Sequence, residues 1–483
     1  MSRPNILIFM TDHQRGDTVL PEHPAITPHL KAFAGQGVTF TNAFCPSPHC
    51  CPSRATFHSG LYPSRHGVWN NVSNAQALSL GLKEGVRLWS EDLAEAGYDL
   101  VWAGKWHISA VESPKDRGWR EFSLTGQVGV NSDPLWNEYR QLAQAGEPTQ
   151  RAPGQMLRPG YGPVTLYGRR DEGNPGDERS ARQVIDALPQ LAAGGKPWAA
   201  FIGCQGPHDP YTVPQRYLDL YDLDKIPLPP SYADELADKP RIYKRMRNAI
   251  FDQLSEREVC DAIRHFWAYC TYLDDLFGQV LAALEATGQA DNTLVVYTSD
   301  HGDYCGEHGL FAKGIPCFRG AYNVPAILRW PAGIKQPARR EEAFITLADF
   351  APTFLELAGV KTERPLTGRS LAPFMQADRP AGWPDDVHTQ CNGVELYCTQ
   401  RSVMTRDFKY IFNGFDDDEL YDLRSDRDEM VNVSARPEYQ QIKRDMLGRM
   451  WRFACREGDT ATRNYITVGL APWGPAEAFR KPT

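Results

Sequence analysis

Four short apolar runs, separated by helical patterns, constrain the fold of this chain most strongly. The runs are residues 6–10, 100–102, 198–202 and 293–297. An apolar run without alternating polar residues is typical of a strand that is covered on both faces of its sheet. Helical patterns that end near glycine precede the last three runs. Together they predict an α/β fold with a large mixed central sheet flanked by helices.

Polar side chains follow each of the four predicted strands. In open α/β sheets, ligands bind outside the carboxyl ends of the strands, so these side chains are expected to meet at one edge. Asp, His and Lys at such an edge predict a site for an anion and a metal ion. In chain order they are Asp12 and His13, Lys105 and His107, His208, and Asp300 and His301.

A second, smaller domain is predicted at the C-terminal end. Residues 378–384, which begin with an aspartate and contain two prolines, indicate a boundary. Beyond it, residues 401–405 and 408–412 predict a hairpin, and residues 437–455 carry apolar side chains at helical spacing. We therefore expect a large α/β domain over residues 1–375. A small α+β domain, an antiparallel sheet with one packed helix, is expected over residues 376–483.

Charge and cysteine content limit the partners and the compartment. A net charge of −8 over 483 residues provides no basic surface for nucleic acid or for a membrane. The apolar run at residues 5–10 is too short for a signal-peptide core, and no stretch approaches the ~20 apolar residues of a membrane span. The eleven cysteines lack the spacing of a disulfide framework. These features favour a cytoplasmic protein with reduced thiols, and they leave a homo-oligomer open.

The segment Cys50-Cys51-Pro52-Ser53-Arg54 carries the most specific motif in the chain. It resembles the signature of the type I sulfatases, a family of the alkaline phosphatase superfamily. The resemblance implies that a formylglycine-generating enzyme oxidises Cys50 to formylglycine, whose hydrate is the nucleophile, and that Arg54 contacts it. A bare thiolate that attacks sulfur would form a thiosulfate ester, and it has no second hydroxyl whose deprotonation could expel the sulfate. An unmodified structural Cys50 and a site that uses metal-bound water are the alternatives.

Three further segments resemble sulfatase blocks. Residues 299–314 resemble the second metal block, which implies that Asp300 and His301 bind the metal and that Lys313 contacts sulfate. In residues 104–107 the resemblance implies that the lysine and the histidine touch the nucleophile and the sulfate. In residues 206–211 it implies that the histidine helps to protonate the leaving oxygen. The catalytic residues implied in this way are Cys50, Arg54, Lys105, His107, His208 and Lys313.

The first metal block departs from the family pattern. Many sulfatases have two consecutive aspartates after the first strand, and related phosphonate monoester hydrolases have an amide at the second position, whereas this chain has Asp12-His13. The resemblance favours one Ca²⁺ ion. If His13 binds, two imidazoles would favour Mn²⁺, and Mg²⁺ is a third candidate. The expected metal ligands are Asp12, His13, Cys50, Asp300 and His301.

The resemblance extends over nearly the whole chain, because residues 323–331, 349–353, 367–371 and 419–423 also look like sulfatase segments. It implies arylsulfatase-like hydrolysis of a small-molecule or sugar sulfate ester. A phosphonate monoester hydrolase or phosphodiesterase that uses the same site is the main alternative. A non-catalytic anion-binding relative with a decayed site is a further alternative, although most of the site positions are retained.

Overall fold

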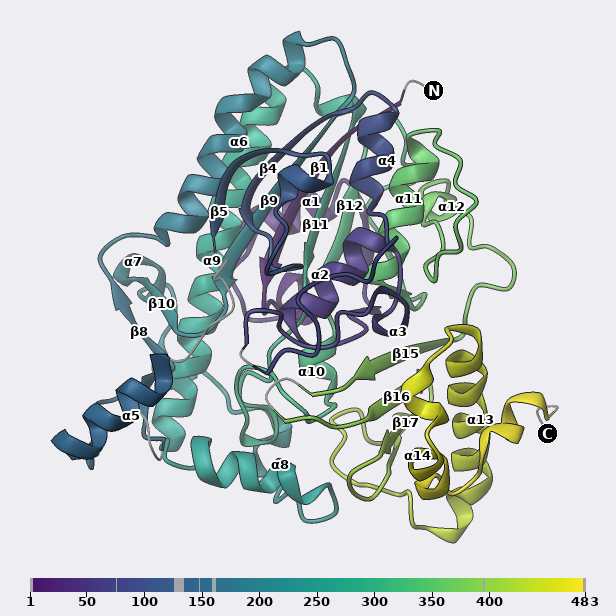
Figure 1. Cartoon of the computed structure of the whole chain (residues 1–483). Helices are drawn as coiled ribbons and strands as arrows, with labels where there is room; N and C mark the ends of the chain where they lie inside the picture. Colours follow the sequence, from purple (N-terminus) through teal and green to yellow (C-terminus); the bar gives the residue numbers. More distant parts are fainter. Residues whose placement is uncertain are drawn as a thin grey trace.

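The computed structural model describes residues 3–74, 76–125, 134–146, 148–158, 162–393 and 396–480 (Figure 1). An eight-stranded mixed sheet forms the centre of the molecule, with helices on both of its faces, as the sequence predicts. Across the sheet the strands are β13 (Arg339–Glu341), β2 (Val38–Phe40), β12 (Ala326–Arg329), β11 (Thr293–Ser299), β1 (Asn5–Asp12), β9 (Trp198–Pro207), β4 (Asp99–Lys105) and β5 (Arg120–Thr125).

The four predicted apolar runs are confirmed as β1, β4, β9 and β11. Strand β1 lies between β9 and β11 and is parallel to both, with Ile6 opposite Ala199 on one side and Leu294 on the other. Strand β4 is parallel to β9 and β5, whereas β12 is antiparallel to β11 and β2. Since β1, β4, β9 and β11 run in one direction, their carboxyl ends share one edge of the sheet.

Helices cover both faces of the central sheet. One face carries α1 (Pro28–Ala34), α6 (Pro175–Ala193) and α9 (Glu256–Ala286), and the other carries α2 (Cys50–Ser59), α4 (Trp89–Glu95) and α11 (Phe350–Leu357) (Figure 1). Helix α9 is the long helix that precedes β11, and it begins at Glu256. Ser255 and Glu258 form a capping box there, in which each residue bonds the backbone N–H of the other.

Shorter elements complete the large α/β body. The region between residues 111 and 177 contains the edge strand β5 and several shorter elements. The short helices are α3 (Pro63–His66), α5 (Pro134–Ala145), α7 (Gln215–Leu218), α8 (Arg241–Met246), α10 (Arg319–Tyr322) and α12 (Ala372–Met375). The short strand pairs are β3 (Ala43–Phe44) with β14 (Ile345–Thr346), β6 (Gln155–Met156) with β7 (Val164–Thr165), and β8 (Tyr167–Arg170) with β10 (Tyr211–Pro214).

The C-terminal part contains the predicted antiparallel sheet and helix. The sheet order is β15 (Asp386–Cys391), β16 (Gln400–Thr405), β17 (Phe408–Asn413) and β18 (Glu419–Asp422). Helix α13 (Gln440–Arg456) packs on it through a separate apolar cluster, and α14 (Tyr465–Leu470) follows (Figure 1). The hairpin and the helix are therefore confirmed, while the domain boundary at residue 375 stays a prediction.

Two further findings concern the cysteines and the helices. All eleven cysteines are free thiols. Among the helices of the described residues, none is both long and apolar enough to span a bilayer. A cytoplasmic location stays a prediction.

His58 is a polar side chain in an aromatic part of the core. It lies in the last turn of α2, is fully buried, and its ring stacks on Trp89 with the centroids 5.6 Å apart. Phe201 and Trp102 are also in contact with it, with centroids at 5.2 and 5.3 Å. Neither ring nitrogen has a hydrogen-bond partner among the described residues. Burial lowers the pKa of His58 well below 6.5, with a smaller contribution from Arg54.

We expect His58→Leu to stabilise the folded protein. At neutral pH the gain should be about 1 to 2 kcal/mol, because leucine removes two buried polar atoms that lack partners. Below pH 6.5 the unfolded chain binds a proton at His58 that the folded chain does not, so the gain should grow by about 1.4 kcal/mol per pH unit. Denaturant unfolding of both proteins at about pH 7.5 and about pH 5.5 measures this. The half-exposed His29, changed to Gln, is the control, and an equal gain at both pH values would contradict the prediction.

Candidate active site

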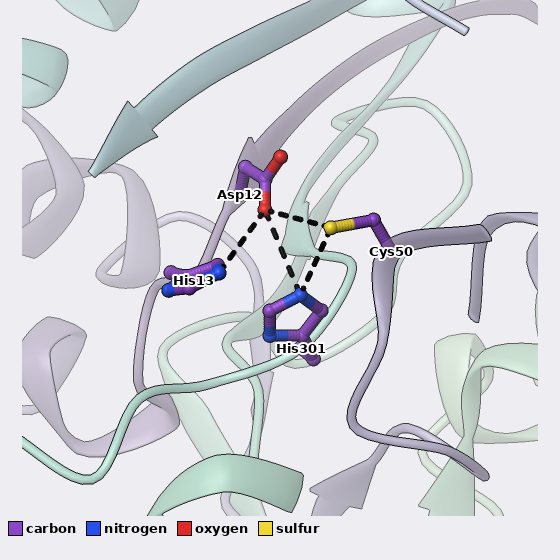
Figure 2. A group of neighbouring side chains, drawn as sticks. All are labelled: Asp12, His13, Cys50 and His301. Carbon is purple, nitrogen blue, oxygen red and sulfur yellow. Dashed lines mark hydrogen bonds and ion pairs between the residues drawn. The ribbon is translucent and has the colours of Figure 1, made fainter. Parts of the chain in front are cut away.

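The motif cysteine faces the carboxyl edge of the central sheet. Cys50 is the first residue of α2 and is buried, so the positive end of the helix dipole lies beside its thiol. Its Sγ lies 3.6 Å from Asp12 Oδ1 at the end of β1 and 3.4 Å from His301 Nε2 just beyond β11 (Figure 2). Helix α2 therefore delivers the cysteine to the edge at which the sequence predicts the site.

A group of possible metal ligands surrounds this contact. Asp12, His13, Cys50 and His301 each turn one ligand atom toward the others, with all four atoms within 4.8 Å of one another (Figure 2). Asp12 Oδ1 lies 3.9 Å from His13 Nε2 and 3.7 Å from His301 Nε2. All four residues are fully buried or nearly so. A carboxylate and two imidazoles converging in a buried pocket fit a divalent metal ion.

Asp300 lies beside this group of four. Its Oδ2 accepts a hydrogen bond of 2.8 Å from Arg54 Nε, and its Oδ1 accepts one of 2.9 Å from the backbone N–H of His301. The same Oδ1 is 3.9 Å from His301 Nε2. Arg54 also donates to the carbonyl of Lys105 at 3.0 Å. The hydrogen bonds of the guanidinium in the described residues thus go to Asp300 and to a backbone carbonyl, and its role at the nucleophile stays a prediction.

Cations stabilise negative charge at position 50. Lys105 Nζ forms an ion pair with Asp12 Oδ2, and Lys313 Nζ lies 2.5 Å from His13 Nε2. Burial alone would raise the pKa of the Cys50 thiol, but Lys105, Lys313 and His301 outweigh it and hold the pKa well below 9.0. His107, which accepts or donates a 3.3 Å bond with Ser73 Oγ, adds to this effect. An anionic oxygen or sulfur is therefore favoured there.

His208 and Lys313 form a second pair of donors. Burial and Lys313 lower the pKa of His208, but the Asp209 carboxylate, 3.1 Å from Nδ1, outweighs them, and the pKa rises to about 10. Lys313 Nζ is 2.9 Å from His208 Nε2. Two cationic groups at this distance repel each other, and an anion that contacts both would relieve the repulsion. The pair is therefore suited to hold an oxyanion and to give it a proton.

Two acidic residues of the site were not singled out in the sequence. Asp209 raises the pKa of His208, and the buried Asp303 contacts His13 Nδ1 at 3.0 Å. Asp303 also accepts from Tyr211 OH at 2.7 Å, and burial raises its pKa to about 7. Both aspartates lie within segments that resemble sulfatase blocks, and this position is the sequence signal that could have identified them. The fold decides which histidine each carboxylate contacts.

Proteins of a known family share the sequence pattern and the fold of this chain. The family model described as Sulfatase matches residues 4–360. The chain belongs to the sulfatase family. A second model, described as the C-terminal part of N-sulphoglucosamine sulphohydrolase, matches residues 306–455 of this sulfatase-family chain.

Individual members of the superfamily are similar over most of their length. The choline-sulfatase of Rhizobium meliloti (strain 1021) is 30% identical over 454 residues, which cover 90% of this chain and 83% of that protein. The phosphonate monoester hydrolase of Agrobacterium radiobacter has a TM-score of 0.76 at 23% identity, with 94% and 96% of the two chains covered. A structure solved with its substrate D-glucosamine-2-N,6-O-disulfate has a TM-score of 0.75 at 21% identity, with 96% and 100% covered.

Membership makes this chain a hydrolase of the alkaline phosphatase superfamily, as the motifs predict. Sulfatases typically use formylglycine and a metal ion, and the buried group of Asp12, His13, Cys50 and His301 is a possible metal site. The structure brings together all the residues that the sequence predicts for the site. The roles of the individual side chains in this sulfatase stay proposals.

Proposed function

We propose that this chain hydrolyses sulfate monoesters, with formylglycine made from Cys50 as the nucleophile and one divalent metal ion as cofactor. The observation that carries the proposal is the position of the motif cysteine, which lies inside the buried Asp and His group and faces two lysines. A structural cysteine in an apolar core would instead have a raised pKa, as its neighbour Cys51 has.

The cofactor and the modified residue would supply the chemistry that a thiol cannot. The hydrate of a formylglycine offers one hydroxyl to attack sulfur and a second whose deprotonation releases sulfate. A divalent metal held by Asp12, His13, His301 and the side chain at position 50, with Asp300 beside it, would lower the pKa of a hydroxyl and neutralise sulfate charge. Two imidazoles favour Mn²⁺, the resemblance favours Ca²⁺, and Mg²⁺ is the third candidate.

The lysines and histidines of the site would stabilise negative charge and transfer a proton. Lys105, fixed by its ion pair with Asp12, would stabilise the negative charge of the attacking group together with His107. Lys313 would bind the sulfate, and His208, kept protonated by Asp209, would give its proton to the leaving oxygen. Arg54 would hold Asp300 and Asp12 in place, at 2.8 and 3.7 Å.

The substrate class, the maturation, the location and the oligomeric state are also proposals. The names of the relatives support a small-molecule or sugar sulfate ester as substrate, since one is a choline-sulfatase and another was solved with a disulfated sugar. Maturation by a formylglycine-generating enzyme follows from the motif. A cytoplasmic location and a homo-oligomeric state stay predictions.

A phosphonate monoester hydrolase or phosphodiesterase with the same site is the second candidate. The residue at position 13 favours it, because a neutral histidine stands where many sulfatases have a second carboxylate. Related phosphonate monoester hydrolases carry an amide at this position, and an amide, like a neutral histidine, has no charge.

The two candidates differ in the substrate that is turned over fastest. With formylglycine-containing protein, we expect the highest kcat/KM for an aryl sulfate, compared with an aryl phosphonate monoester and a phosphodiester with the same aryl group. Because the leaving group is the same in all three substrates, differences in kcat/KM report the preference for sulfur or for phosphorus. A preference for either phosphorus substrate above about 100-fold, or about 2.7 kcal/mol in transition-state free energy, would overturn the proposal.

A further inference from the structure

His13 has different partners on its two ring nitrogens. Lys313 Nζ is 2.5 Å from Nε2, and Asp303 Oδ2 is 3.0 Å from Nδ1. A charged lysine has protons to donate and no lone pair, so Nε2 must be the acceptor. The ring proton is then on Nδ1, which donates it to Asp303. The unprotonated Nε2 is also the atom that faces Asp12 Oδ1, at 3.9 Å (Figure 2).

Asp303 is itself held firmly. Its side chain is fully buried, and Tyr211 OH donates to the same Oδ2 at 2.7 Å. The backbone N–H of Cys305 donates to Oδ1 at 2.8 Å, and Arg15 Nη1 donates to the carbonyl oxygen of Asp303 at 3.2 Å. Contacts with His13, Tyr211 and Cys305 thus hold the two carboxylate oxygens, and the carboxylate has little freedom to turn.

Other groups near the His13 ring do not replace this partner. Asp209 Oδ1 is 3.9 Å from Nδ1, beyond a hydrogen bond, and it is engaged by His208 Nδ1 at 3.1 Å. The rings of His208 and His301 lie tilted against the His13 ring, with centroids 3.9 and 4.4 Å away. Their ring nitrogens contact other groups. The backbone of His13 has φ 71°, a conformation that residues with a side chain rarely adopt, so its surroundings must fix its orientation.

We propose that Asp303, held by Tyr211, is a positioning residue that keeps the proton of His13 on Nδ1, so that Nε2 presents its one lone pair to the group of possible metal ligands, where a metal ion would replace the Lys313 contact. The proposal rests on the metal site of the proposed function. A carboxylate partner on the far nitrogen fixes the tautomer and ring orientation of a metal-binding histidine and makes it a stronger ligand. Asp303 would in this way allow a histidine to serve in the ligand group.

A double-mutant cycle on metal affinity tests whether Asp303 acts through His13. Equilibrium dialysis against Mn²⁺ measures the affinity of the wild type, Asp303→Asn, His13→Ala and the double variant. We expect Asp303→Asn to weaken Mn²⁺ binding by about 10- to 100-fold in the wild-type background. In the His13→Ala background it should change the affinity by no more than about twofold, because the residue that it positions is gone. An equal loss in both backgrounds would show that Asp303 acts by its charge alone and would overturn the proposal.

Two further variants keep the test decisive. Tyr211→Phe removes the hydroxyl that holds Asp303 and should weaken Mn²⁺ binding in the same His13-dependent way, so it replaces Asp303→Asn if that variant fails to fold. Asp349→Asn, a buried aspartate that bonds Thr346 and Arg369, is the matched control and should leave the affinity unchanged.

Dialysis does not depend on turnover, so the role of Asp303 and the sulfatase activity are tested separately. If the wild type binds metal but prefers phosphonates, the proposed activity is wrong and the role of Asp303 is unaffected. If the wild type binds no divalent metal, both the metal part of the proposed function and the role of Asp303 are wrong.

Discussion

Cys50→Ala should lower kcat/KM for a sulfate ester by about 10⁴-fold or more, because the variant has no side chain from which the nucleophile can be made. Cys51→Ala is the matched control. Cys51 is also buried, but its Sγ accepts a bond from the backbone N–H of Val72 at 3.4 Å and lies outside the group of possible metal ligands. Its replacement should leave kcat/KM within about fivefold of the wild type.

The state of residue 50 can be read independently of the rate. Conversion of cysteine to formylglycine should make the peptide that contains residue 50 lighter by ~18 Da, and the aldehyde should react with a hydrazide. Protein made together with a formylglycine-generating enzyme is the appropriate sample. Full activity from protein with an unmodified Cys50 would contradict the prediction and would favour attack by the thiolate or by metal-bound water.

The sequence predicts the central strands well because their burial removes ambiguity. Strands β1, β9 and β11 are covered on both faces, so their apolar runs have no polar interruption. The edge strand β5 was missed because all of its residues are partly or fully exposed, which gives no apolar run. Strand β2 has only three residues, too few for a period to show.

The site was predictable as a set of residues but not as a set of contacts. Asp12, Lys105 and His208 follow strands that are parallel in one sheet, so their meeting at one edge follows from topology. The contacts around His13 do not follow. Its partner Asp303 comes from a loop, and Tyr211, which donates to Asp303, comes from the separate pair of β8 and β10. Such contacts depend on backbone turns, among them the positive φ of His13, that no periodicity records.

His208→Ala should have the second largest effect, and its size should depend on the leaving group. A general acid contributes about 10²- to 10⁴-fold, so we expect a loss of that size for an alkyl sulfate, whose alcohol leaves poorly without a proton. For 4-nitrophenyl sulfate the loss should be at most about tenfold, since the phenolate departs without protonation. An equal loss for both substrates would contradict proton transfer and would show that His208 binds or positions the sulfate.

The pH profile gives the same mechanism a second test through Asp209→Asn. The Asp209 carboxylate raises the pKa of His208 to about 10, so the wild type should keep the histidine protonated through neutral pH. Without this carboxylate the pKa of His208 should fall, because burial and Lys313 both oppose the charged form. A general acid works only while it is protonated, so kcat/KM for the alkyl sulfate should begin to decline at a lower pH in the variant than in the wild type. For 4-nitrophenyl sulfate the decline should not shift, since that substrate does not need the proton. A shift of equal size for both substrates would mean that the charge of His208 holds the sulfate, and the assignment of His208 as the acid would then be wrong.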